Sequence, residues 1–227
     1  MNQGINREQP AKENQRGQGA FDEVLNSATH GLGAVLSVFG LIVLLVVAYH
    51  TDPDPWKMVS FSVYGISLVL LFTASALYHG IREKRIKALL QKLDHSAIYI
   101  LIAGTYTPFT LVALPGGWGW TFFGIIWGLA LAGILFQVFF YKERYRILST
   151  LLYVAMSCLI IFAIEPLISS VPVGALYWLL AGGVFYIGGV WFYIRKNKPL
   201  NHVVWHLFVL AGAGAHFLAI FIYLLPY

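Results

Sequence analysis

The chain has 227 residues, of which 59% are hydrophobic, 16% aromatic and only 11% charged, and this composition excludes an ordinary soluble domain. Its single cysteine excludes a disulfide framework and a thiolate metal site. The net charge of +5 does not indicate nucleic acid as a partner, because the charges lie between apolar segments rather than on one face, so we expect a polytopic membrane protein.

Residues 1–20 are polar and are predicted to form a disordered tail. They lack the charged-then-apolar layout of a cleavable signal peptide. Residues 21–227 are expected to form one membrane domain. At its start, Glu23, Asn26 and His30 fall on one stripe of a helix that leads into the first span.

Apolar stretches of about 20 residues, the length that crosses a bilayer, recur along the rest of the chain. Turn residues such as those at 115–117 mark most of the breaks between them. The spans are expected at about 30–49, 56–78, 96–114, 118–141, 147–168, 171–193 and 202–225. The predicted fold class is therefore all-α, a bundle of seven transmembrane helices.

The placement of positive charge predicts the orientation of the bundle. Every Lys and Arg except Lys57 lies in the N-terminal tail or in the second, fourth or sixth connection. The positive-inside rule assigns that side to the cytoplasm. We therefore expect a multi-pass protein of the cell membrane, with its N-terminus in the cytoplasm and its C-terminus outside.

Four segments bring His, Asp or Glu residues to the cytoplasmic end of the predicted bundle. His202 and His206 lie one turn apart at the start of the seventh span, so their imidazoles share one face. Ser75 and His79 end the second span on one face, and Asp94 opens the third. The fourth segment is the stripe that precedes the first span.

Three neutral imidazoles with one open position form the ligand set of a catalytic zinc site. We therefore predict that His79, His202 and His206 bind zinc, and that Asp94 holds or deprotonates the water at the metal. The residues alone leave two alternatives open: another metal such as iron or manganese, and a hydrogen-bonded polar plug without metal.

Together these residues resemble the hemolysin III family, the bacterial branch of the progestin and adipoQ receptor superfamily, whose animal members include the adiponectin receptors. The resemblance covers about residues 21–225 and rests on Glu23-x-x-Asn26-x-x-x-His30, Ser75-x-x-x-His79, Asp94 with Tyr99 and Gly104-Thr105-Tyr106-Thr107-Pro108, and His202-x-x-x-His206. In the receptor branch, three histidines bind zinc on the cytoplasmic side of a seven-helix bundle. The resemblance therefore implies that the three histidines are zinc ligands, that Asp94 contacts the metal through water and that Ser75 orients the site or its water.

Receptor-branch proteins and the related alkaline ceramidases are linked to zinc-dependent hydrolysis of lipid amides. The resemblance thus implies a ceramidase-like hydrolase of a membrane-lipid amide or ester, with membrane lipids as partners. Two alternatives stay open: a non-catalytic membrane regulator or sensor with a structural zinc, and a pore-forming cytolysin. A hydrolase needs an open metal position, a structural site has a fourth protein ligand, and a pore needs a polar stripe through the whole bilayer.

Three further histidines are expected to lie outside the ligand set. His95 is expected to face the interface or a lipid headgroup. His216 lies ten residues past His206, about 15 Å along a helix, and is expected to make a helix-packing hydrogen bond or to line an inner cavity. His30 is expected beside the site, while the other two residues of its stripe brace the N-terminal helix.

Overall fold

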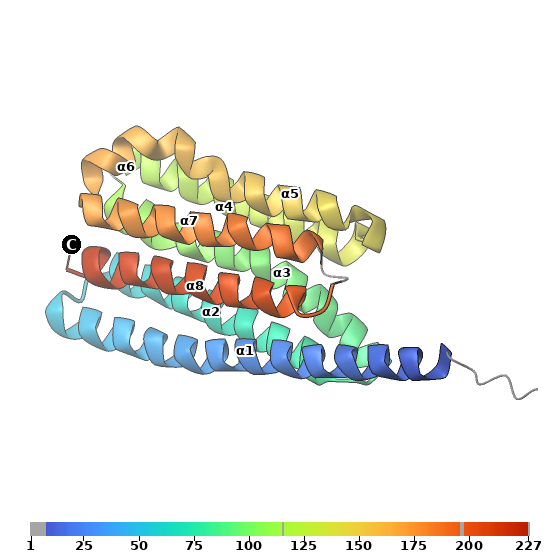
Figure 1. Cartoon of the computed structure of the whole chain (residues 1–227). Coiled ribbons are helices and arrows are strands. Elements are labelled where there is room, and N and C mark those ends of the chain that lie inside the picture. Colours follow the sequence, from blue (N-terminus) through green and yellow to red (C-terminus); the bar gives the residue numbers. More distant parts are fainter. Residues whose placement is uncertain (1–7, 115, 196–197, 227) are drawn as a thin grey trace, which may run out of the picture.

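A computed structural model describes residues 8–114, 116–195 and 198–226, with side chains described from Gly19 onward. Among these residues the regular structure is entirely helical, and seven helices are long and apolar enough to cross a membrane. They run side by side along one axis, and the N-terminal helix extends from the end opposite the C-terminus (Figure 1). The predicted all-α bundle of seven spans is confirmed.

The spans are built from eight α-helices with short 3₁₀ and π segments between them. The α-helices are α1 Glu8–Thr51, α2 Pro55–Gly80, α3 Lys84–Pro108, α4 Gly116–Leu135, α5 Arg146–Ser157, α6 Ile164–Ser170, α7 Val173–Ile194 and α8 Asn201–Ala219. The π segments are η1 Phe109–Ala113, η2 Phe136–Phe140 and η5 Ile220–Leu224. The 3₁₀ segments are η3 Glu143–Tyr145 and η4 Cys158–Ala163, and the latter joins α5 to α6 within the fifth span.

Two helices extend beyond the predicted spans at the same end of the bundle. Helix α1 begins at Glu8, and α3 begins at Lys84 rather than near residue 96, because the charged turns before each apolar stretch are also helical. The Glu83 side chain caps α3 by accepting from the backbone N–H of Arg85 at 3.0 Å and of Ile86 at 2.7 Å. The first seven residues of the predicted 1–20 tail lie outside the described part of the chain, and the division into tail and membrane domain stays a prediction.

The fifth span changes its helical geometry ahead of Pro166. Proline lacks an N–H group and its ring clashes with the carbonyl four residues earlier, so the α-helical bonding is interrupted there. A buried tyrosine satisfies part of the freed backbone, since the Tyr106 hydroxyl accepts from Ile160 N–H and donates to the Ser157 carbonyl, both at 2.8 Å. Backbone groups inside a bilayer need such partners, so Tyr106 stabilises the break from the neighbouring helix.

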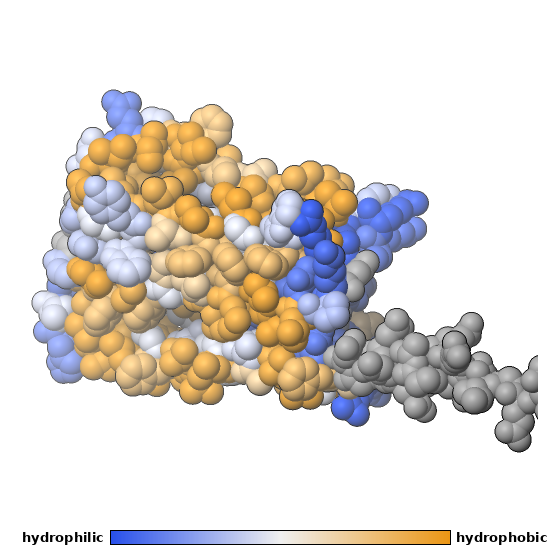
Figure 2. Space-filling view, in the orientation of Figure 1, coloured by the Kyte–Doolittle hydropathy of each residue, from blue (hydrophilic) through white to orange (hydrophobic). Residues whose placement is uncertain are grey.

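The surface and the centre of the bundle differ as expected for a protein in a bilayer. Hydrophobic residues cover the middle of the visible face of the bundle (Figure 2). Hydrophilic residues gather at the two ends of the bundle, most densely at the end from which the N-terminal helix extends. The third span is the most buried. In its apolar 18-residue stretch 67% is buried inside the protein, against 17% in the corresponding stretch of the sixth span. Polar side chains on α3 therefore meet other helices on most sides.

Helix α8 starts from a strained turn and packs closely on α7. Leu200 adopts a left-handed conformation with φ 61°, and its N–H donates to the Asp22 carboxylate of α1 at 3.1 Å. A side chain at Gly189 of α7 would place its first carbon 2.8 Å from Phe208 and Trp205, so glycine is required for the close approach. This packing fixes the start of α8, where two of the predicted metal ligands lie.

Candidate metal centre

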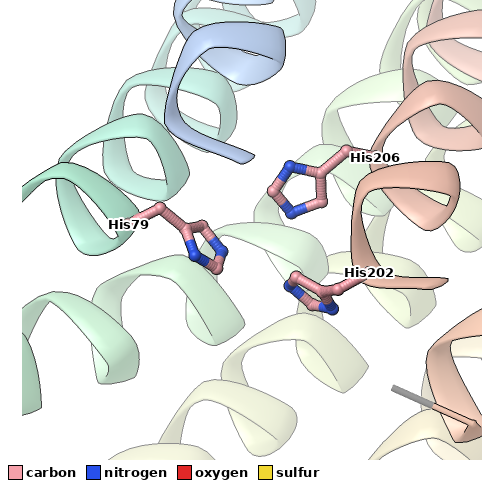
Figure 3. A group of neighbouring side chains, drawn as sticks. All are labelled: His79, His202 and His206. Carbon is pink, nitrogen blue, oxygen red and sulfur yellow. The ribbon is translucent and has the colours of Figure 1, made fainter. Parts of the chain in front are cut away.

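The last turn of α2 and the first two turns of α8 bring three imidazoles together. His79 lies in the last turn of α2, and His202 and His206 lie one turn apart on α8. The three rings surround a common space (Figure 3), and one ring nitrogen from each lies within 4.8 Å of the others. Small side-chain rotations are enough for all three to bind one ion, since zinc–nitrogen bonds are about 2.0–2.1 Å long.

A carboxylate on α1 orients the first of these rings. His79 Nδ1 lies 3.1 Å from Glu23 Oε2, and Lys87 Nζ lies 2.9 Å from the same oxygen. Since an ionised carboxylate only accepts hydrogen bonds, the Nδ1 of His79 must be the donor. Its Nε2 is buried, has no hydrogen-bond partner among the described residues and carries the lone pair that a metal needs.

A backbone carbonyl of the same helix orients the second ring. His206 Nδ1 lies 3.2 Å from the carbonyl oxygen of Asn26 and 3.4 Å from Thr29 Oγ1. The carbonyl can only accept, so Nδ1 carries the proton and Nε2 is left available to a metal. The Thr29 hydroxyl itself donates to the carbonyls of Leu25 and Asn26, at 2.9 and 3.0 Å. Helix α1 therefore fixes the tautomer of two of the three histidines.

His30 lies directly against the cluster without belonging to it. Its ring stacks on His206 with centroids 3.6 Å apart and an angle of 9° between the planes, and Phe72 meets its face edge-on at 5.0 Å. Both ring nitrogens of His30 are buried and have no hydrogen-bond partner within the described part of the chain. The stack holds the plane of His206 from the membrane side, as the expectation that His30 lies beside the site predicts.

The other two predicted site residues lie together next to the cluster. Ser75 is fully buried on α2, and the Asp94 carboxyl of α3 is directed to it and is near His79. Asp94 is not part of the group whose donor atoms lie within 4.8 Å of one another. Searching the described residues for His, Cys, Asp and Glu gives no fourth member of that group. Within the described ranges, the cluster thus offers three imidazole ligands and no fourth His, Cys, Asp or Glu ligand.

A second buried polar network, which we call the Gln137 network, lies between α3, η2 and α5. Gln137 Nε2 lies 3.0 Å from His95 Nδ1, and Ser149 Oγ donates to Gln137 Oε1 at 3.3 Å. The Tyr153 hydroxyl donates to the backbone carbonyl of His95 at 3.0 Å. The expectation that His95 faces the interface or a headgroup is wrong, because α3 is central and α4 and α5 cover that side. The lone amide in the apolar fourth span was the sequence signal for this network.

His216 has the packing role that was one of its two expected roles. Its Nε2 lies 3.2 Å from the carbonyl of Leu179 on α7, and Gly182 provides the space for its ring. It stands apart from the three clustered histidines, which agrees with the spacing argument.

Comparison with known proteins gives one family and several full-length relatives. Residues 19–217 match the family described as Haemolysin-III related. Hemolysin-3 of Bacillus cereus is 45% identical over 205 residues, covering 90% of this chain and 93% of that protein. The Hemolysin-3 homolog of Bacillus subtilis is 44% identical over 202 residues, covering 89% and 94%. The human monocyte to macrophage differentiation factor is 28% identical over 211 residues, covering 90% and 85%.

Proposed function

Since this chain belongs to the Haemolysin-III related family, we propose that it is a zinc-dependent hydrolase of an amide or ester bond in a membrane lipid. We further propose that it lies in the cell membrane with its N-terminus in the cytoplasm, because its Lys and Arg residues gather on that side. The observation that supports the proposal best is the cluster of His79, His202 and His206, with donor atoms within 4.8 Å of one another.

The environment of the three imidazoles fits a metal ion better than a polar plug. A plug would satisfy its members by hydrogen bonds among themselves, whereas Nε2 of His79 is buried without a partner among the described residues. The Nδ1 atoms of His79 and His206 are held by groups on α1, which leaves the opposite nitrogens for a ligand. Three imidazoles suit zinc among the common divalent metals.

The remaining residues support hydrolysis. Zinc held by the three histidines would supply Lewis-acid activation of a water molecule and of the substrate carbonyl. Asp94 would orient a water molecule and accept its proton, and Ser75 holds the Asp94 carboxyl in place. The surrounding helices bury His79 and His206, which limits the access of bulk water. Because the cluster lies at the polar end of an apolar bundle, a lipid with its linkage near the headgroup is the substrate class that reaches it.

The alternatives have less support. A structural zinc site would have a fourth protein ligand, and among the described residues no fourth ligand joins the three histidines. A pore would need a polar stripe through the bundle. Instead, buried hydroxyls farther along the spans donate to carbonyls of their own helices, as Ser37, Ser67 and Thr107 do. The names of the bacterial relatives refer to haemolysis, but these contacts do not favour a channel.

The metal content of the purified protein tests the proposal. Elemental mass spectrometry is expected to find about one zinc per chain in the wild type, and none in His79→Ala or His206→Ala. Lipid amides and esters are then screened with Asp94→Asn as the control, which is expected to keep zinc and lose hydrolysis. Wild-type protein that carries no metal, after growth with zinc and purification without chelator, contradicts the proposal.

A further inference from the structure

A cavity of about 350 Å³ opens between α1, α2 and the start of α3, at the end of the bundle where Lys and Arg gather. Glu23 and the metal-cluster histidine His79 form part of its wall. Arg82 and Lys87 line it from the other side, and the rest is mainly small and apolar. The cavity thus shares His79 with the candidate metal centre.

The cavity carries an excess of positive charge. Its two cations face one carboxylate, since Lys87 Nζ lies 2.9 Å from Glu23 Oε2. An ammonium group has three N–H donors, and one hydrogen bond is formed by Lys87 among the described residues. Arg82 is exposed and forms no hydrogen bond or ion pair within the part of the chain that the structure describes. Both cations therefore have donors for an anionic group.

The depth and shape of the cavity favour a lipid as the source of that group. It lies at the end of the spans that is expected to face the cytoplasmic leaflet, and basic pockets between membrane helices at that depth bind anionic headgroups. Gly80 keeps its wall open, because a side chain there would place its first carbon 3.0 Å from Ser27 Oγ. The apolar side chains of Ala20 and Ala28 suit the glycerol and upper acyl region of a phospholipid.

We propose that this cavity binds the phosphate group of an anionic phospholipid, with Arg82 and Lys87 as its donors. The proposal is independent of hydrolysis at the metal centre. Because Lys87 and His79 share one oxygen of Glu23, the bound headgroup contacts a lysine that is itself bonded to the carboxylate orienting a metal-cluster histidine.

Lipid retention by the full chain tests the proposal. The protein is placed in phosphatidylcholine nanodiscs with increasing phosphatidylglycerol, and retained phosphatidylglycerol is measured by native mass spectrometry. Arg82→Gln and Lys87→Gln are each expected to weaken retention about tenfold, the size of a lost hydrogen bond to a charged group. The control is Arg85→Gln, which removes the same charge from the same connection at a residue outside the cavity. Weakening in the control as large as in Arg82→Gln, or no retention by the wild type, overturns the proposal.

A second arm distinguishes a lipid headgroup from free phosphate. Inorganic phosphate is added to the protein in pure phosphatidylcholine nanodiscs, and its binding is followed by calorimetry. No saturable binding is expected at millimolar phosphate, because the apolar part of the ligand is missing. Saturable binding that Arg82→Gln abolishes, without any preference for phosphatidylglycerol, assigns the cavity to free phosphate and overturns the lipid. Zinc content and thermal unfolding are measured on the same samples, so a failed lipid site is not confused with a failed metal site or a misfolded variant.

Discussion

The metal cluster and the Gln137 network are two buried polar groups near the same end of the bundle, but their hydrogen bonding differs. In the Gln137 network, Gln137 satisfies His95 and Ser149 through its two side-chain atoms. In the metal cluster, the bonds lead outward to α1, and Nε2 of His79 faces the other imidazoles without a partner among the described residues. The unpartnered Nε2 of His79, which faces other imidazoles, therefore indicates a ligand, whereas the paired side chains of the Gln137 network indicate a structural role.

The largest expected effect is on zinc content, and it distinguishes the metal cluster from the Gln137 network when a histidine of each is replaced by alanine. His202→Ala removes one of the three imidazoles of the proposed zinc site, so zinc is expected to be lost during dialysis against a weak chelator. His95→Ala removes an imidazole from the Gln137 network, and full zinc content is expected. Elemental analysis measures the zinc content of both variants. Equal zinc in the two would remove the distinction between the groups.

A smaller effect is expected from the residue that orients His79. Glu23→Gln keeps an acceptor for His79 Nδ1 but removes its charge, so the zinc dissociation constant is expected to rise about 10- to 100-fold, as for other groups behind metal ligands. Competition with a fluorescent chelator measures it. The control is Asp52→Asn beyond the other end of the same helix, since Asp52 pairs with Lys57 at 2.7 Å rather than with an imidazole. An equal loss in both variants would indicate a general effect of charge.

Breaking the Gln137 network is expected to reduce stability rather than metal binding. Gln137→Leu leaves the part-buried His95 Nδ1 and the buried Ser149 Oγ without the amide that they face, which costs about 1–3 kcal/mol. A lower Tm in detergent with unchanged zinc content is the expected result. Ser169→Ala, which removes an exposed hydroxyl bonded to its own helix, is the control. A loss of zinc in Gln137→Leu would show that the two groups act as one.

The smallest expected effect concerns α3, which carries residues of both groups. Hydrogen bonds from Ile86 and Arg85 N–H lower the pKa of Glu83 below its ordinary value of 4.5. The lowered pKa means that the cap stabilises α3 above pH 4.5 and that this contribution is lost as the pH falls through the lowered value. Glu83→Gln should therefore have a slightly lower Tm than the wild type from pH 7 down to about pH 4.5, with the difference shrinking as the pH falls further. A difference that stays constant well below pH 4.5 would contradict the capping role.

The sequence was sufficient for the spans and for the group of three histidines, because apolar length and one-turn spacing express helix geometry directly. The family expected from the motifs is also confirmed. The partners of the histidines were only partly predictable. Glu23 was expected to brace α1, and it does so through His79, whereas the partner of His206 is the backbone carbonyl of Asn26. A backbone atom has no sequence signature.

The wrong expectation for His95 has a related cause. His95 follows Asp94 at the start of the third span, and neighbouring residues on a helix point about 100° apart, so an inward Asp94 is compatible with a His95 that faces the interface. That inference holds for a helix at the edge of a bundle. Helix α3 is enclosed, and the side that would otherwise face lipid meets Gln137 and Tyr153. Which helix is central depends on the packing of all seven spans, and the periodicity of a single span does not predict it.

Helix α1 contributes no histidine to the cluster, yet it holds two of the three through Glu23 and Asn26. Thermodynamic linkage makes this relation reciprocal: a metal that binds more tightly when α1 is docked also holds α1 in place. At a hundredfold excess over its dissociation constant, a metal that binds only the docked form stabilises it by about 2.7 kcal/mol. If the proposed zinc site is correct, adding zinc is expected to increase the protease resistance of the first helix, which can be measured without observing the metal.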